Sequence, residues 1–283
     1  MKCWQRTIRE MALPEPEEEQ KKELARKFCR ATVEVRQITY AEAKPLVLQY
    51  EWLGTMGSAR WCFGLFIGPY LAGVEVFGTT AGNRAAAAIA GPEYADRVCT
   101  LVRGCCLPWA DHPVDSGGRT HTGRAASFLI SRACKLIADQ HGKNIVVAYS
   151  DPQAGEIGTI YQSVNAIYTG TTSATEQYRS PDGKLHDTRQ LSGLTRDRRR
   201  GGLAYIRSRN SQRLLLLQQG AHFVRSVPKH RYLLVSGNRT VKRILRAAIK
   251  LPSLPYPKRE LGTICPEFMS KVDCHPSTAT GAD

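Results

Sequence analysis

The hydrophobic and polar positions of the chain follow two periods, and each change of period marks a new element. Alternating and β-branched runs indicate strands, and apolar residues spaced three or four apart indicate helices. Gly68 and Pro69 separate two aromatic-rich runs and therefore predict a β-hairpin turn. The elements predicted in the first half are a strand over 33–40, a helix over 41–54, hairpin arms over 61–68 and 71–78, a short helix within a loop over 81–97, and a strand over 98–108.

The most informative stretch of the second half covers residues 144–170. Its apolar run at 145–148 predicts a short buried strand, which ends at the polar cluster 149–152. The apolar spacing over 159–167 predicts a helix that follows this loop. In open α/β sheets, functional sites gather at the carboxyl ends of strands, so we expect the site at this strand end.

Further elements are predicted on both sides of that stretch. Residues 124–142 carry one apolar stripe, which predicts an amphipathic helix. Downstream, two predicted strands flank a Pro-Asp-Gly turn at 181–183, a basic helical segment follows, and a last strand covers 231–236. From Leu251 onward, prolines and weak periodicity predict a mobile tail.

Charge and composition narrow the class of protein. The 283 residues include 40 Lys and Arg against 25 Asp and Glu, a formal charge of +15 that favours a polyanionic partner, although a generic basic protein has the same balance. The nine cysteines lack disulfide-framework and zinc-ligand spacing, so we expect reduced thiols, no metal and a cytoplasmic location. No apolar run approaches the ~18 residues of a membrane span, and no secretory signal opens the chain, so we expect no membrane partner.

The order of these elements, with a glycine-containing loop entering a helix after the fourth strand, resembles the GNAT acetyltransferase fold. In that fold the loop wraps a pyrophosphate, whose charge lies on backbone N–H groups at the helix N-terminus. An ordinary helix N-cap is the structural alternative for this segment. Thr120 stands where the family usually has Gln or Arg. The candidate donor-binding residues are Arg119, Thr120, Thr122, Gly123, Arg124 and Ala125.

A more specific resemblance is to the phage Mom family of DNA-modification proteins, a divergent branch of the same fold. Three segments carry it, YEWLGTMG at 50–57, FGLFIGPYLAGVEVFG at 63–78 and YSDPQAGEIGTIYQSVNAIYTG at 149–170, with further similarity in DGKLHDTRQLSG and PKHRYLLV. Two positions depart from the family pattern: Glu156 stands where a histidine is expected, and Gln49 precedes Tyr50 where a histidine is common.

The resemblance implies a fold class and a domain order. The expected architecture is α/β, a GNAT-like mixed, mostly antiparallel sheet flanked by helices, with a basic insert before the last strand. The corresponding domains are a charged N-terminal arm or helix at 1–30, a transferase-like domain at 31–250 with its insert at about 179–228, and a flexible tail at 251–283.

The resemblance also implies a function: a transferase that alters adenine at N6 in double-stranded DNA. The family's product is carbamoylmethyladenine, which in phage or host-invading DNA protects against restriction. An enzyme of this kind must extrude the base, hold it and remove a proton as the new bond forms. The donor implied is a small molecule, acetyl-CoA or a related acyl or glycine-derived compound, and the location is the cytoplasm of the host cell.

Specific residues are candidates for these roles. Asp151 is expected to accept the proton or orient the amine, Tyr161 to donate a proton to a leaving group, and Arg103 to neutralise donor charge or bind phosphate. Tyr149 and Ser150 complete the candidate catalytic strand end. The candidate DNA-binding residues are Arg198, Arg199, Arg200 and Arg207 for phosphates, and Trp52 and Tyr168 for stacking on a flipped base.

Each of these assignments has a structural alternative. Asp151 before Pro152 is also typical of a turn cap, Arg103 of an ion pair, and the aromatic residues of a core. Two other functions also fit the sequence. One is a GNAT-type N-acyltransferase acting on an amine, aminoacyl or protein substrate, and the other is a non-enzymatic nucleic-acid-binding protein on the same scaffold.

Overall fold

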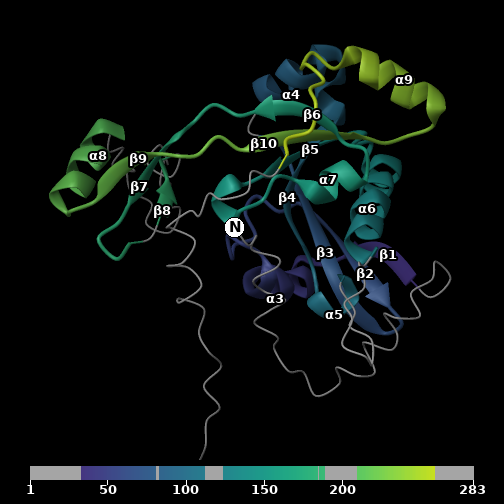
Figure 1. Cartoon of the computed structure of the whole chain (residues 1–283), viewed down its shortest axis with the longest axis horizontal. Coiled ribbons are helices and arrows are strands. Elements are labelled where there is room, and N and C mark those ends of the chain that lie inside the picture. The colour runs from purple at the N-terminus through teal and green to yellow at the C-terminus, as the bar shows by residue number, and fades with distance from the viewer. Residues whose placement is uncertain (1–32, 81–82, 112–123, 184, 189–208, 259–283) are drawn as a thin grey trace, which may run out of the picture. The chain divides into compact units, whose positions relative to one another are not determined.

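The computed structural model of the protein describes residues 33–80, 83–111, 124–183, 185–188 and 209–258 (Figure 1). The described chain forms two compact units. The larger unit comprises the chain up to Thr171 and again from His230, and the smaller unit comprises Thr172–Lys229. The predicted N-terminal arm lies outside the described residues.

A seven-stranded sheet forms the centre of the larger unit, in the order β1-β2-β3-β4-β5-β10-β6. All neighbouring strands are antiparallel except β4 and β5, which are parallel. The predicted α/β class, a mixed and mostly antiparallel sheet flanked by helices, is therefore confirmed. The strands are β1 (Val33–Ile38), β2 (Trp61–Ile67), β3 (Tyr70–Gly78), β4 (Val98–Cys106), β5 (Ile145–Ser150), β6 (Ile167–Thr171) and β10 (His230–Val235).

Helices cover both faces of this sheet. On one face, Leu129 of α6 (Ala125–His141) lies against the backbone of Gly73 in β3. On the other face, Cys105 of β4 donates from its thiol to the carbonyl of Leu46 in α3 (Tyr40–Tyr50). Residues at the core of a sheet covered on both sides are apolar in sequence without alternation, which is the pattern that predicted β5.

A second apolar cluster lies under α4 (Asn83–Ala90) and α9 (Arg239–Ala248), which lie together above β10 in Figure 1. Ile145 and Val147 of β5 belong to this cluster, whereas Val146 and Ala148 belong to the main core on the α6 side. The remaining short helices of the larger unit are η1 (Pro92–Arg97), α5 (Pro108–Asp111), η2 (Pro152–Ala154) and α7 (Thr159–Ser163).

The helix predicted over 159–167 is shorter than expected, and this part of the prediction is wrong. Helix α7 ends at Ser163, and Asn165 adopts the left-handed conformation with φ of 56°. Asparagine tolerates this conformation better than most residues, so it reverses the chain into β6 at once. Ile167, expected on the apolar face of the helix, is the first residue of β6.

The first residues of the predicted tail lie along the outer edge of the sheet. The backbone N–H of Leu254 donates to the carbonyl of Tyr168 at 2.9 Å, and the hydroxyl of Tyr256 donates to the carbonyl of Ala166 at 2.8 Å. Residues 251–258 thereby occupy hydrogen-bonding positions beside the edge strand β6, and an edge covered in this way cannot template pairing with another chain. Residues 259–283 lie outside the described part of the chain.

The smaller unit is a three-stranded antiparallel sheet with one helix. Its elements are β7 (Glu176–Arg179), β8 (Leu185–Asp187), α8 (Arg209–Gln218) and β9 (His222–Arg225), with strand order β8-β7-β9. Arg213 of α8 pairs with Glu176 at 2.5 Å, and its guanidinium carbon lies 3.9 Å from the centre of the Phe223 ring. The segment predicted as a basic insert lies within this unit. Among the described helices of both units, none is long and apolar enough to cross a membrane.

Candidate functional site

The candidate site lies where β4 and β5 separate. These parallel strands pair only over Val98–Thr100 with Ile145–Val147, and the rest of β4 continues beside β3. A register shift in the β3–β4 pair, between the partners Leu101 and Arg103, leaves Val102 as an extra residue, which bends the strand. The open end is therefore formed by the carboxyl ends of two parallel strands, the position at which α/β sheets place their sites.

The end of β5 carries three of the predicted catalytic residues. The ring of Tyr149 is exposed, whereas Ser150 is buried and its hydroxyl has no hydrogen-bond partner among the described residues. Asp151 follows half-buried and accepts a hydrogen bond from the backbone N–H of Gln153 at 3.0 Å. The turn-cap interpretation of Asp151 is thus correct, and this cap also fixes the direction in which its carboxyl group points.

Tyr161 of α7 extends into the same end of the molecule. Its ring packs against that of Tyr232, with ring centres 5.3 Å apart. Burial raises the pKa of the Tyr161 phenol well above its ordinary value. Three nearby carboxyl groups raise this pKa further, those of Glu75, Glu156 and Glu51. The phenol therefore keeps its proton and is available as a hydrogen-bond or proton donor.

Glu75 of β3 is a buried acid that the sequence patterns did not single out. Its residue is 7% exposed, and its Oε2 atom has no hydrogen-bond partner within the described part of the chain. Burial raises the pKa of the Glu75 carboxyl group well above its ordinary value. Gly104 on β4 lies opposite, and a Cβ atom there would collide with the Glu75 carboxyl group. The absence of a side chain at Gly104 thus leaves space for the Glu75 carboxyl group.

Arg103 makes the structural contacts that the ion-pair interpretation required. Its Nε atom donates to the carbonyl of Thr55 at 2.5 Å and lies 3.5 Å from the carboxylate of Glu51. Its Nη2 atom donates to the Thr55 hydroxyl at 2.8 Å. These contacts hold the loop after α3 against β4, and that loop includes Trp52, which is half-buried. Arg103 therefore has a structural role, in which it joins the loop after α3 to β4.

Tyr168 lies in an aromatic group beside the site. Its ring centre is 5.1 Å from that of Tyr232, and its hydroxyl lies 2.9 Å from Nδ1 of His230. Only 8% of Tyr168 is exposed. The structure therefore shows it as a packed side chain that links β6 to β10, and stacking on a flipped base stays a prediction.

The predicted donor loop is only partly described. Arg124 is exposed and precedes α6, whose first residue Ala125 is buried. Because α6 follows β4 along the chain, its N-terminus lies at the open end formed by β4 and β5. Residues Arg119, Thr120, Thr122 and Gly123 lie outside the described residues, as do the predicted phosphate contacts Arg198, Arg199, Arg200 and Arg207.

Together these residues offer two kinds of chemistry. Tyr161 is partly buried and Glu75 is buried, and in their protonated forms both side chains are O–H donors, which can stabilise charge that develops on an oxygen or a leaving group. Asp151 offers a carboxyl group at the strand end, suited to orienting or deprotonating an amine. No group of three or more His, Cys, Asp or Glu side chains suited to a metal ion occurs in the described ranges.

Gly158 is the residue that places Tyr161. It precedes α7 in the left-handed conformation with φ of 76°, and a Cβ atom there would strike the ring of Tyr232. We expect Gly158→Ala to lose ~1–2 kcal/mol from the left-handed backbone and a further ~1–3 kcal/mol from the clash. Denaturant unfolding of the purified variant measures this loss.

Gly142→Ala is the matched control for that prediction. Gly142 is also left-handed, with φ of 67°, but a Cβ atom there would meet nothing within 4 Å. Gly142→Ala should lose only the ~1–2 kcal/mol of stability that the left-handed backbone costs. Equal losses in the two variants would contradict the packing of Tyr232 against Gly158.

Comparisons with known proteins bear on this site. A sequence profile of the Mom protein family matches residues 32–258. No curated protein matches the chain. Among solved structures, the chain is similar to the IAA acetyltransferase from Bacillus cereus ATCC 14579, with 9% identity over 72% of this chain and 99% of that chain and a TM-score of 0.35.

Two further solved structures are similar. An acetyltransferase from Bacillus subtilis in complex with CoA has 14% identity over 72% of this chain and 97% of that chain, with a TM-score of 0.32. A tandem GNAT protein from the clavulanic acid biosynthesis pathway has 14% identity over 55% of this chain and 50% of that chain, with a TM-score of 0.33. These scores are too low to support a functional argument. The profile match covers both the sheet and the open strand end, and the chain belongs to the Mom protein family.

Proposed function

We propose that the protein is a DNA-modifying transferase that alters adenine at N6, with a carbamoylmethylation-like product. The observation that carries the proposal is the Mom family match over residues 32–258, which includes every described residue of the candidate site. In phage or host-invading DNA, such a modification would protect the DNA from restriction.

The N6 amine of adenine must be exposed and activated before it can react. The N6 lone pair is delocalised into the adenine ring, so the amine is a poor nucleophile, and base pairing hides it within the duplex. In our proposal the base is extruded into the open end formed by β4 and β5. Asp151 orients the amine and accepts its proton as the carbon–nitrogen bond forms. The cap from Gln153 holds the Asp151 carboxyl group in place for this step.

The hydroxyl of Tyr161 and the carboxyl group of Glu75 act on the donor molecule. As N6 gains its bond to the donor carbon, the leaving group departs with the electron pair of the bond that breaks. Tyr161 supplies the hydrogen bond or proton that this group needs. Glu75, buried beside it, donates a second hydrogen bond to the donor. The raised pKa values of both side chains support this role, because only the protonated forms can donate.

The donor itself is proposed as acetyl-CoA or a related acyl or glycine-derived molecule. The residues Arg119–Ala125 would hold its phosphate or other anion at the N-terminus of α6. Double-stranded DNA is the proposed acceptor, with phosphate contacts from Arg198, Arg199, Arg200 and Arg207 and stacking by Trp52 and Tyr168.

Mass spectrometry of nuclease-digested DNA tests the function. DNA from cells that express the protein should contain an adenine nucleoside of increased mass, and DNA from cells that express Tyr161→Phe should contain little of it. A digest without a new nucleoside, together with turnover of acetyl-CoA on simple amines, would instead indicate an N-acyltransferase. Retention of DNA without either product would indicate a binding protein.

A further inference from the structure

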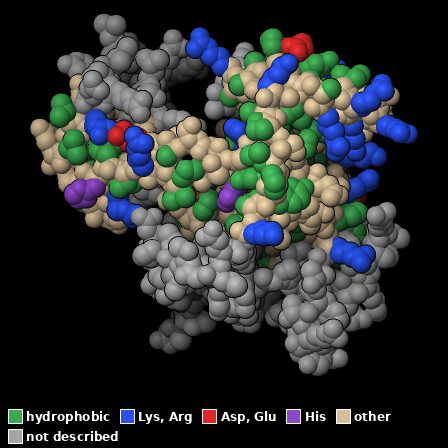
Figure 2. Space-filling view, turned by 45° about the horizontal axis from the view of Figure 1, so that its top comes forward, with side chains coloured by type: hydrophobic (Ala, Val, Ile, Leu, Met, Phe, Trp, Pro, Cys, Tyr) green, Lys and Arg blue, Asp and Glu red, His purple; other side chains and the backbone are tan. Residues whose placement is uncertain are grey.

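Helix α9 carries a line of cations on its outer surface. Arg239, Lys242, Arg243 and Arg246 are all exposed, and Lys250 continues the line after the helix ends. Successive helical residues turn by about 100°, so the first four fall within an arc of about 100° on one side of the helix. We call Arg239, Lys242, Arg243, Arg246 and Lys250 the α9 stripe. Figure 2 shows Lys and Arg side chains gathered at the right of the view, over this helix.

No acidic side chains in the surrounding sequence neutralise this stripe. Residues 198–259 contain neither Asp nor Glu. Within the described part of the chain, none of the stripe's side chains forms an ion pair. Like charges three and four residues apart on a helix repel one another, and no ion pair within the described structure offsets this repulsion.

The helix beneath the stripe is firmly anchored. Leu245 is 1% exposed and packs in the apolar cluster with α4. The side chain of Asn238 caps the helix by accepting from the backbone N–H of Val241 at 2.9 Å. After the helix, the N–H of Lys250 donates to the carbonyl of Ile89 at 2.8 Å. The stripe therefore has a fixed spacing along about 10 Å of helix, as the rise of ~1.5 Å per residue gives.

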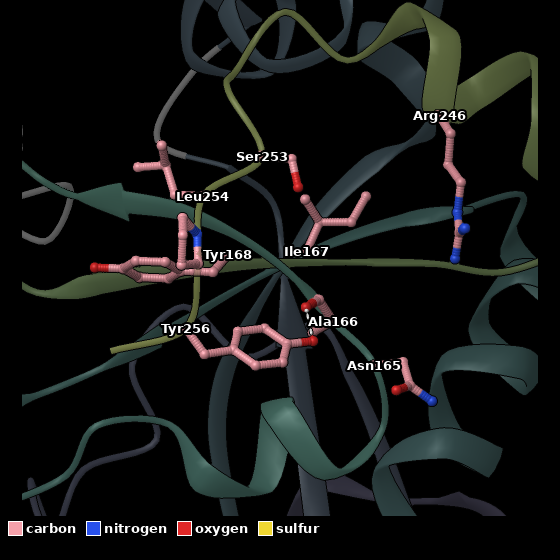
Figure 3. Close-up of a pocket in the computed structure, with 9 residues that line it drawn as sticks. Asn165, Ala166, Ile167, Tyr168, Arg246, Ser253, Leu254 and Tyr256 are labelled. Carbon is pink, nitrogen blue, oxygen red and sulfur yellow. Dashed lines mark hydrogen bonds between the residues drawn. The ribbon is translucent and has the colours of Figure 1, made fainter. Parts of the chain in front are cut away.

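An open pocket of about 350 Å³ adjoins the stripe at Arg246. In Figure 3, Arg246 reaches from α9 toward the side of the pocket on which Asn165 lies, and the ring of Tyr256 forms another wall. Ser253 adds a hydroxyl to the lining. A cation, an amide, a hydroxyl and an aromatic ring around one open pocket suit a sugar–phosphate unit, because phosphate oxygens accept hydrogen bonds from each polar group.

We propose that the α9 stripe and its adjoining pocket bind the sugar–phosphate backbone of duplex DNA. This inference rests on the proposed function, in which DNA is the acceptor, and names phosphate-binding residues other than the predicted Arg198, Arg199, Arg200 and Arg207. Cations on a rigid helix bind phosphates and release condensed counterions, and they position the duplex without reading its sequence.

A membrane surface fits the helix less well. Helices that lie in a membrane interface insert an apolar face rich in Leu, Phe and Trp. The apolar face of α9 is turned inward, with Leu245 in the core, and Ile244 is the only large hydrophobic residue of the described helix that is exposed. The stripe therefore lacks the apolar partner that membrane insertion requires.

Salt-dependent binding of a duplex to the purified full chain tests the inference. We expect Arg243→Gln/Arg246→Gln to weaken binding and to reduce the slope of log affinity against log salt by about 1.8, since each lost phosphate contact contributes about 0.9. The matched control is Arg132→Gln/Lys135→Gln, which removes the same charge from exposed positions on α6. The control should keep the wild-type slope.

Two further measurements complete the test. Arg243→Lys/Arg246→Lys keeps the charge and should keep the slope. A reduced slope in the glutamine variant alone would then reflect lost phosphate contacts and not lost folding. An unchanged slope in the glutamine variant would overturn the inference. The inference would also be overturned if the glutamine variant bound duplex DNA like the wild type but lost binding to anionic phosphatidylglycerol vesicles. The proposed function is tested independently, because the wild-type digest either contains the modified nucleoside or does not.

Discussion

Replacing Tyr161 by phenylalanine is expected to reduce adenine modification by roughly 10²–10⁴-fold, the usual contribution of a general acid or base. The substitution removes one hydroxyl and keeps the ring that packs against Tyr232 at 5.3 Å. Because the fold depends on the ring, the free energy of unfolding and duplex affinity should stay close to those of the wild type. Tyr40→Phe, at a residue that is 50% exposed, is the control and should keep full activity.

Asp151→Asn is expected to cause a comparable loss for a different reason. The amide oxygen of asparagine can still accept the hydrogen bond from the N–H of Gln153, so the turn after β5 should form normally. The variant lacks the carboxylate charge and the ability to take up a proton. Quantification of the modified nucleoside in digested DNA measures both losses. Wild-type levels in both variants would remove Asp151 and Tyr161 from the chemistry.

The sequence predicts the strands in which most apolar residues of the local pattern are also buried in the structure. The run 145–148 is apolar on both sides because α6 covers one face of β5 and the α4–α9 pair covers the other. The hairpin arms are similarly apolar, and Gly68, with φ of 57°, makes the turn between them. The second of these segments, the hairpin at 63–78, is also one of those that carry the resemblance to the Mom family.

The parts that were missed depend on partners distant in the sequence. Glu75 is the single acid in the otherwise apolar arm 71–78, and no local pattern shows whether such an acid is buried or exposed. Its burial requires neighbours that are distant in the sequence: Gly104 of β4 lies opposite it, and Tyr161 of α7 lies near it. Helix α9 was missed because its regular apolar positions are few. Its charged positions define the helix face more clearly than its core positions do.

The helix predicted through Ile167 shows a third limit. Apolar spacing of three and four residues continued past the true end of α7, because the next strand begins with an apolar residue. The signal that ends the helix is Asn165, a single residue whose left-handed conformation is common only to a few residue types. Periodicity alone does not distinguish a helix that continues from one that reverses into a strand.

Glu75 should be required for activity although it weakens the fold. Removing an unpaired buried polar group with an apolar side chain of similar shape is often neutral or stabilising. We therefore expect Glu75→Met to unfold at equal or higher denaturant concentration than the wild type. The same variant should lose roughly 10²–10³-fold in modification, the usual cost of removing one donor that stabilises transition-state charge. Glu75→Gln restores an N–H donor and should recover part of the activity.

The pH dependence of stability provides a separate check on Glu75. Its pKa is raised in the folded state by burial, so the unfolded chain releases this proton at lower pH than the folded chain does. The contribution of Glu75 to stability is fully present below the unfolded pKa of about 4.3 and is lost as pH rises through the folded pKa. The advantage of Glu75→Gln over the wild type should therefore grow with pH, which denaturant unfolding between about pH 5 and pH 8 measures. An advantage that stays constant over this range would show that the Glu75 carboxyl group is ionised in the folded protein, and the hydrogen-bond donor would then have to be Tyr161 alone.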